Sequence, residues 1–191
     1  MPTADRKLTM EELGRPDAET FRAMPKNRLR FILDDVRSRH NTGSLFRTAD
    51  AFAMHGLDLC GFTPLPPHRE MEKTALGATL TVPWEHHASA AEAVRKWKAA
   101  GWQVWAVEQT VQAVPVTAWR PDLAKGTALV LGNELHGVHE AVVALCDGAV
   151  VVPQGGTKHS LNVSVCGGIV AAMALFGTFP GSAATVPHVL R

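Results

Sequence analysis

Short apolar runs alternate with segments of helical pattern along most of the chain. The apolar runs have the length of buried strands, and they cover residues 30–36, 57–62, 102–108, 127–132 and 149–153. The segments of helical pattern cover residues 18–24, 41–56, 88–100, 139–146 and 160–177. Strands that alternate with helices predict an α/β domain, in which a mostly parallel sheet has helices on both faces.

Capping residues set the expected bounds of two helices. Asn41 is expected to cap the N-terminus of the helix over 41–56, and Gly56 is expected to end it. Gly101 is expected to end the helix over 88–100. The Pro-rich stretch 63–87 is expected to be a long irregular connection, and a loop of that length inside a compact domain is usually functional or mobile.

The composition limits the number of domains. With 191 residues, of which 46% are hydrophobic and 19% are charged, the chain suits one domain with a sizeable core. We expect an N-terminal arm with a short helix over residues 1–27, a main domain over 28–178 and a C-terminal tail over 179–191.

The cysteines and the N-terminus bear on cellular location. Cys60, Cys146 and Cys166 are odd in number and form no C-x-x-C pair, which argues against a disulfide framework and a zinc ribbon. The N-terminus has no apolar core of signal-peptide type, and the apolar stretch 165–179 is shorter than the roughly 20 residues that span a bilayer. We therefore expect a cytoplasmic protein with no membrane partner.

Basic residues cluster in one part of a chain whose formal net charge is only +1. The segment 22–47 contains seven of them, opposed only by Asp34 and Asp35: Arg22, Lys26, Arg28, Arg30, Arg37, Arg39 and Arg47. Such a run is usually a solvated face, and the alternative is a surface for an anion or a nucleic acid.

Three loops follow strands and are expected to meet at one edge of the sheet: 35–44, 132–138 and 153–160. Ligands of parallel α/β sheets bind beyond the carboxyl ends of the strands. Residues 132–137 have the glycine spacing of a phosphate loop, but Val138 and His139 stand where Lys and Ser or Thr are required, and no G-x-G-x-x-G occurs. These absences, with that of G-x-S-x-G, argue against ATP, dinucleotide and serine-hydrolase sites.

Two histidine pairs, one at 86–87 and the other formed by His136 and His139, raise the question of a metal. Neither pair has a third ligand at a telling spacing, so we predict no metal site and expect structural or exposed histidines.

The segment 160–177 is apolar almost all the way round yet begins with Ser160, Asn162 and Ser164. A helix that is apolar on every face is buried, and we expect this one to pack on the sheet and on a partner subunit. Capping by Ser160 would explain only one of the three polar residues. Polar side chains beside the free N–H groups of a helix start favour a functional site there.

Three motifs now stand in order, each after a predicted strand: Asn41-x-Gly43-x-x-x-Arg47-Thr48, LGNELHGV over 131–138 and VPQGGTKHSLNVSV over 152–165. Over about 28–177 they resemble the motifs of SpoU/TrmH-type RNA methyltransferases of the SPOUT class. The resemblance implies that 28–178 is a methyltransferase domain that uses S-adenosylmethionine to methylate a ribose 2′-hydroxyl of RNA. It also implies a homodimer and a C-terminal trefoil knot, which periodicity does not indicate.

The resemblance further implies roles for individual residues. Arg47 would be the central catalytic residue, and Gly132, Val152 and Leu161 would contact the cofactor, with core packing as the alternative for Val152 and Leu161. The residues expected around Arg47 are Asn41, Glu134, Ser160 and Asn162. A guanidinium stays protonated, so we expect Arg47 to hold an RNA phosphate and stabilise the developing alkoxide rather than act as a base. Glu134 is expected to hold Arg47 or Asn41 in position. The alternative interpretation of Glu134 is an acid on the surface with no role in the site.

The RNA substrate is expected to be transfer RNA, with ribosomal RNA as the alternative. The basic segment 22–47 and the stretch 63–87 are expected to select it. A catalytically silent RNA-binding dimer is the alternative of another class, but such a module would not need all five polar site residues. A base methyltransferase of another SPOUT branch is disfavoured by the Ser-Leu-Asn-Val-Ser run over 160–164.

Overall fold

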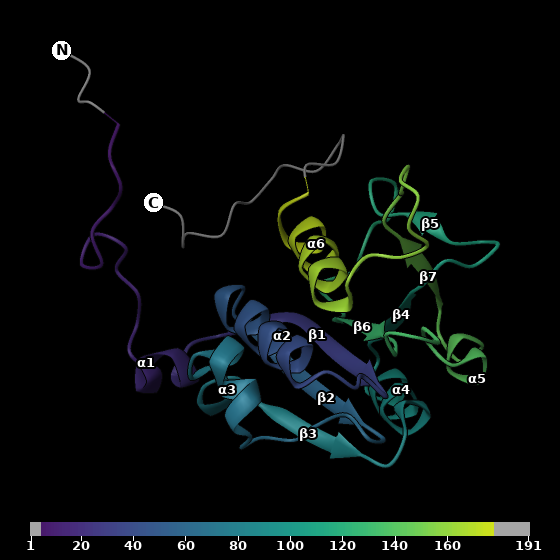
Figure 1. Ribbon diagram of the computed structural model, residues 1–191, viewed down its shortest axis with the longest axis horizontal. Helices are drawn as coiled ribbons and strands as arrows, with labels where there is room; N and C mark the ends of the chain where they lie inside the picture. Colours follow the sequence, from purple (N-terminus) through teal and green to yellow (C-terminus); the bar gives the residue numbers. More distant parts are fainter. Residues whose placement is uncertain (1–4, 178–191) are drawn as a thin grey trace.

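A parallel β-sheet runs through the centre of this computed structural model, which describes residues 5–177 (Figure 1). Its strands are hydrogen-bonded in the order β3-β2-β1-β6-β4-β7-β5, and every pair is parallel. The strand bounds are β1 Asn27–Asp34, β2 Met54–Cys60, β3 Trp84–His87, β4 Gln103–Val107, β5 Val114–Pro115, β6 Thr127–Leu131 and β7 Gly148–Val151. The predicted α/β class is confirmed.

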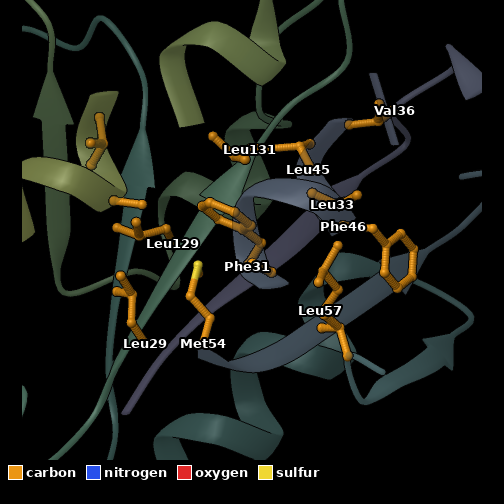
Figure 2. Packing of buried hydrophobic residues seen from close by; sticks show 14 of the residues in the cluster. Leu29, Phe31, Leu33, Val36, Leu45, Phe46, Met54, Leu57, Leu129 and Leu131 are labelled. Carbon is orange, nitrogen blue, oxygen red and sulfur yellow. The ribbon is translucent and has the colours of Figure 1, made fainter. Parts of the chain in front are cut away.

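Helices cover both faces of the sheet because side chains alternate along each strand. Leu29, Phe31 and Leu33 of β1 share one core cluster with residues of α2, α3 and α6, and Figure 2 shows part of that cluster. Ile32 points to the other face, where it packs with residues of α4 and α5. The helix bounds are α1 Ala18–Ala23, α2 Arg39–Ala51, α3 Arg69–Ala75, 3₁₀ helix η1 Ala78–Leu80, α4 Ala90–Ala99, α5 Glu140–Val143 and α6 Val163–Phe176.

The strand order reverses between β1 and β6. From β1 the chain proceeds outward to β2 and β3, whereas β6 is followed on its other side by β4, β7 and β5. Connections that leave β1 and β6 therefore diverge at the carboxyl edge, which is where open α/β sheets bind ligands.

The structure corrects both predicted ends of the helix over 41–56. α2 is capped by Ser38, whose Oγ accepts the Asn41 N–H at 3.2 Å, so Asn41 lies within the first turn. The helix ends at Ala51, and Gly56 belongs to β2. Gly56 is needed for a different reason, because a Cβ there would lie 2.4 Å from the Pro83 carbonyl oxygen.

The stretch 63–87 is more ordered than predicted, since it contains α3, η1 and β3. α3 has only seven residues and follows a run of prolines, so its helical pattern is too short to be distinctive. Two-residue β5 was missed for the same reason. The predicted helix over 139–146 is shorter, because α5 covers only Glu140–Val143.

The basic segment 22–47 is not one solvated face. Arg30 is only 2% exposed, and its Nε donates to Asp58 Oδ2 at 2.7 Å on the neighbouring strand. Asp58 also accepts from the Trp97 indole and pairs with His87 at 2.9 Å. Arg37, Arg39 and Arg47 are the members that lie exposed near the start and middle of α2.

Cys60, Cys146 and Cys166 are all free, in agreement with the prediction that no disulfide framework forms. Within residues 5–177 no helix is long and apolar enough to cross a membrane. The predicted tail 179–191 lies outside the described residues.

Candidate active site

A pocket of about 820 Å³ lies at the carboxyl ends of β4, β6 and β7. We call it the edge pocket, and its walls come from segments 107–110, 131–138, 150–154 and 159–163, with α5 residues at one side. Its size is within the usual range of small-molecule sites, about 300–1,000 Å³. The predicted loops 132–138 and 153–160 both contribute to it, and loop 35–44 is hydrogen-bonded to its wall.

The turn over 132–138 is closed tightly by two glycines. Asn133 N–H donates to the Gly137 carbonyl at 3.0 Å, and Gly137 N–H donates back to Asn133 at 2.8 Å. A Cβ on Gly132 would lie 2.1 Å from Gly137 C and Val138 N, so no side chain fits there. Gly137 has φ +68°, a conformation that favours glycine. At these two positions the turn therefore presents backbone rather than side chain to the pocket.

Glu134 fastens this turn to the start of α2. Its carboxylate accepts from the N–H groups of Arg37 at 2.9 Å and Ser38 at 3.0 Å, and from Asn41 Nδ2 at 2.8 Å. Burial alone would raise the pKa of Glu134, but these hydrogen bonds hold the pKa below its usual value. Of the two partners predicted for Glu134, Asn41 is the one it contacts.

The amides of Asn41 and Asn162 extend this chain of hydrogen bonds to α6. Asn162 Nδ2 donates to Asn41 Oδ1 at 3.0 Å. The side-chain oxygen of Asn162, Oδ1, accepts from Ser164 N–H at 2.9 Å and from Ser164 Oγ at 2.7 Å, so Asn162 caps the helix. Ser160 is therefore not the cap; it lies two residues earlier and lines the edge pocket.

Glu108 and Gln109 are site residues that the sequence patterns did not reveal. They follow β4, and Glu108 Oε2 accepts the Val138 N–H at 3.0 Å while its Oε1 accepts the Gln109 N–H at 2.7 Å. Gln109 Nε2 donates to the His159 carbonyl at 2.7 Å. This pair therefore joins the turn over 132–138 to the loop over 153–162. A polar pair after a strand is too common to mark a site by itself.

The remaining predicted contacts fit a nucleoside with an apolar body and polar edges. Gly132, Val152 and Leu161 all line the edge pocket, together with Leu131, Val138 and Val150. Leu161 is 37% exposed, so core packing does not explain it. Among the described residues, the backbone N–H groups of Ser160 and Leu161 have no hydrogen-bond partner. Free main-chain groups beside an apolar wall suit an adenine ring.

Arg47 does not join this group within one chain. It lies exposed on α2 and lines a second hollow with residues of α3 and with Gly168 of α6. The edge pocket itself has no Lys or Arg in its lining and has three acids, Glu108, Glu134 and Glu140. Of the five residues predicted around the reaction, four therefore lie in or against the edge pocket and Arg47 lies apart.

Two histidines have acidic neighbours that the sequence spacing did not indicate. His139 lies with Asp34 and Asp35, and His87 lies with Asp58 and Glu85, each group having ligand atoms within 4.8 Å. Protein donors occupy much of both groups: Asp34 Oδ2 accepts from His139 N–H and Nδ1, and both Asp58 oxygens are hydrogen-bonded.

Residues 28–172 match the family model of the SpoU rRNA Methylase family. The chain is 35% identical over 151 residues to the 23S rRNA (guanosine-2'-O-)-methyltransferase RlmB of Nitrosomonas europaea, which covers 79% of this chain and 55% of that protein. The chain thus spans about half the length of the curated relatives it matches.

Solved structures of similar fold include one with AdoMet bound. The A. aeolicus TrmH/SpoU tRNA modifying enzyme has a TM-score of 0.72 and 28% identity, over 85% of this chain and 80% of that one. The AdoMet-bound rRNA methyltransferase from Sinorhizobium meliloti has a TM-score of 0.71 and 27% identity, over 80% of this chain and 58% of that one.

Proposed function

The chain belongs to the SpoU rRNA methylase family, and on that premise we propose that it methylates a ribose 2′-hydroxyl of RNA with S-adenosylmethionine. The observation that carries the proposal is the hydrogen-bonded series Asn162, Asn41 and Glu134, which joins residues of all three motifs beside the edge pocket. A fold maintained without catalysis would not need this series, so an enzyme is favoured over a silent RNA-binding dimer.

The edge pocket is the proposed cofactor site. Gly132, Val152 and Leu161 would contact the nucleoside, with main-chain groups of the last two reading the adenine edge. When bound, S-adenosylmethionine supplies an electrophilic methyl group on a sulfonium cation. The carboxylates of Glu108, Glu134 and Glu140 in the lining match the net positive charge of that molecule.

Asn41, Glu134 and Asn162 are proposed to position groups rather than to move the proton. A general base works best with a pKa near the operating pH, whereas the three donors on Glu134 hold its pKa below the usual value. Ser160 lines the edge pocket, its hydroxyl has no hydrogen-bond partner among residues 5–177, and it would contact the ribose. Arg47 would hold an RNA phosphate and stabilise the alkoxide that forms during transfer.

A homodimer would bring Arg47 to the edge pocket of the partner subunit. α6 buries Gly167, Val170, Ala171 and Ala174 in its own chain, while Val165 is 52% exposed and Phe176 is 41% exposed on the other side. Gly168 has open space around it and borders the hollow that contains Arg47. A second copy on this apolar face would therefore lie beside Arg47.

Gly167 serves the chain itself rather than the partner. A Cβ there would lie 2.8 Å from Leu45 and 2.9 Å from Leu131, so α6 packs closely on α2 and β6 at this glycine. The proposed interface is thus formed by Val165, Gly168 and Phe176.

The proposal includes the C-terminal trefoil knot that family resemblance implies. It also includes the division into an arm over 1–27, the methyltransferase domain over 28–178 and a tail over 179–191. An RNA substrate would place the reaction in the cytoplasm, and the proposed chemistry needs no metal.

Transfer RNA is the first candidate substrate. The similar A. aeolicus structure is named as a tRNA modifying enzyme, and the chain covers 80% of it. Ribosomal RNA is the second candidate, because the relative with 35% identity is named for 23S rRNA.

The reaction is tested by incubating the protein with labelled S-adenosylmethionine and unmodified tRNA or rRNA transcripts. Nucleosides from the product should contain one 2′-O-methyl nucleoside by mass spectrometry, and RNA from a deletion strain should lack the same one. A methylated base, or no label in either RNA despite cofactor binding, would contradict the proposal.

The dimer is tested by sedimentation at micromolar concentration with Val165→Glu as the variant. The parent should sediment as a dimer, and Val165→Glu should be monomeric and inactive while retaining its fold. A monomeric parent that still methylates RNA would refute the dimer.

A further inference from the structure

A second hollow, of about 540 Å³, lies between α2, α3 and α6, and we call it the helix hollow. Four of its residues form one stripe of α2 at spacings of three and four, and two more come from the last turn of α3: Ser44, Arg47, Thr48, Ala51, Lys73 and Thr74. Figure 1 shows α3 and α6 on either side of α2, which contacts both helices.

The lining of the helix hollow has the chemistry of an anion site. It contains two cations, Arg47 and Lys73, and no carboxylate. Within residues 5–177 the Arg47 guanidinium and the hydroxyls of Ser44 and Thr48 have no hydrogen-bond partner, so these donors are free. Phosphate oxygens accept from Arg, Lys and hydroxyl donors of this kind.

The wall that holds these donors is rigid. A Cβ on Gly43 would lie 2.3 Å from the Met71 carbonyl oxygen and the Thr74 hydroxyl, so α2 and α3 cross in close contact. Thr74 Oγ1 donates to the His40 carbonyl at 3.0 Å, which ties α3 to the first turn of α2. Lys73 therefore projects from a fixed helix end rather than from a mobile loop.

One neighbouring carboxylate competes for Lys73. Glu70, outside the lining of the helix hollow, approaches the Lys73 ammonium at 2.8 Å and His40 at 3.5 Å. The Lys73 side chain is half exposed, so this ion pair is weak and is easily exchanged for a phosphate.

We propose that Lys73, with Arg47 and the hydroxyls of Ser44 and Thr48, forms a binding site for a phosphodiester of the RNA substrate. The inference rests on the proposed function and adds Lys73 of α3 as a backbone contact. The charges of the two sites favour the helix hollow as the place where RNA phosphate binds, because acids line the edge pocket and cations line the helix hollow. Ala51, Phe52 and Gly168 complete the lining, and Gly168 also belongs to the α6 face proposed for the partner subunit, so the helix hollow borders that face.

The test measures binding of a fluorescein-labelled, unmodified tRNA transcript to the full-length protein by anisotropy between about 50 and 200 mM salt. Lys73→Gln should weaken binding about tenfold at the lower salt and reduce the slope of log K against log salt by about one phosphate contact. The matched control is Lys125→Gln, since Lys125 is also exposed and also pairs with an acid at i−3, Asp122. The control should bind as the parent does.

A second variant should change RNA affinity in the opposite direction. Glu70→Gln removes the competing carboxylate and should tighten RNA binding about two- to fivefold at low salt. Cofactor affinity by calorimetry and thermal stability should be unchanged in all three variants, which separates this site from the edge pocket and from misfolding.

Equal RNA binding by Lys73→Gln and Lys125→Gln would overturn the phosphodiester site while leaving the methyltransferase function intact. A Lys73→Gln protein that loses the dimer in sedimentation but keeps its salt slope would also overturn it, since the helix hollow would then face a second copy. Failure of the parent to transfer methyl groups in the transcript assay is a separate outcome, which concerns the proposed function.

Discussion

The edge pocket and the helix hollow are lined by opposite charges, although both adjoin α6. The edge pocket contains Glu108, Glu134 and Glu140 and no Lys or Arg, whereas the helix hollow contains Arg47 and Lys73 and no acid. A polyanionic substrate and a cationic cofactor would each be repelled from the site of the other. The division of charge thus indicates two ligands that meet only at a boundary, and it explains why Arg47 lies apart from the other site residues.

The walls of the two sites are also held differently. Loops form most of the edge pocket, and side chains such as Glu108, Gln109 and Asn162 fasten them to one another. Helices form the helix hollow, and their close crossing at Gly43 holds it. Substitutions in the edge pocket should therefore alter cofactor binding through loop position, while those in the helix hollow should alter charge alone.

The largest expected effect comes from Arg47→Ala. If Arg47 stabilises charge that develops during transfer, kcat should fall about 10²- to 10³-fold, because interactions made only in the transition state act on turnover. Affinity for S-adenosylmethionine, measured by calorimetry, should remain that of the parent, because Arg47 is not in the lining of the edge pocket of its own chain and is expected to act on the transition state rather than on the bound cofactor.

Arg39→Ala is the matched control for this prediction. Arg39 is the first residue of the same helix, is exposed and does not line the helix hollow. Its removal should leave kcat within about threefold of the parent, a change of under 1 kcal/mol. If the kcat of Arg47→Ala also stayed within about threefold of the parent, Arg47 would have no catalytic role. The helix hollow would then not differ from the rest of the surface in its effect on the reaction.

Gly137→Ala should have the next largest effect and should act on the edge pocket alone. Its φ of +68° disfavours a side chain, and a Cβ would lie 2.2 Å from Glu108 Oε2, so the variant strains the turn and displaces its partner. We expect the free energy of unfolding to fall by about 1–3 kcal/mol. Gly156→Ala, where a Cβ meets nothing within 4 Å, should unfold as the parent does in urea. Equal stability of the two variants would contradict the tight turn.

The sequence predicted the parts of this arrangement that depend on local pattern. The apolar runs of β1, β4 and β6 and the helical spacing of α2 and α4 are continuous along the chain, so their class could be assigned from periodicity. The meeting of the motif loops followed from strand direction, since parallel strands bring their carboxyl ends to one edge. The contact between Asn41 and Glu134 was one of two predicted partners for that acid.

What depends on strand order could not be predicted in this way. Glu108 reaches Val138 only because β4 lies beside β6, and Arg30 is buried only because Asp58 faces it from β2. The capping residue of α2 was assigned to Asn41 because its side chain suits a cap, whereas the structure uses that amide to join two loops. A capping residue and a site residue have the same local signature.

Glu108→Gln sharpens the comparison by separating charge from position. The variant loses the charged acceptor for Val138 N–H, so we expect affinity for S-adenosylmethionine to fall about tenfold by calorimetry. Glu140→Gln removes the same charge from the same lining, but Glu140 is exposed on α5. The loss of affinity for S-adenosylmethionine should be smaller in this variant, about threefold or less, because solvent and salt partly screen an exposed charge. Equal losses in the two variants would mean that charge alone matters and that Glu108 has no positioning role.

The smallest expected effect is pH-dependent and again belongs only to the edge pocket. His139 caps α5 next to the pocket wall, and its Nδ1 lies 3.0 Å from Asp34 Oδ2. The hydrogen bond to Asp34, with the charges of Asp34 and Asp35, raises the pKa of His139 above its usual value. A raised folded-state pKa means that the stabilisation is complete below the unfolded-state pKa of about 6.5 and is lost as the pH rises through the folded-state value.

The measurement compares the parent with His139→Gln by urea unfolding at pH 6 and pH 8. At pH 6 the free energy of unfolding of the parent should exceed that of the variant by about 0.2–1 kcal/mol, a small difference because the His139 side chain is 53% exposed to solvent. The difference should shrink at pH 8. The same substitution in an Asp34→Asn background should show a much smaller pH dependence, because that background removes the carboxylate that raises the pKa of His139 most and leaves only the weaker effect of Asp35. A difference that grows toward pH 8, or that survives undiminished in the Asp34→Asn background, would mean that this wall of the edge pocket is held by packing, as the helix hollow is.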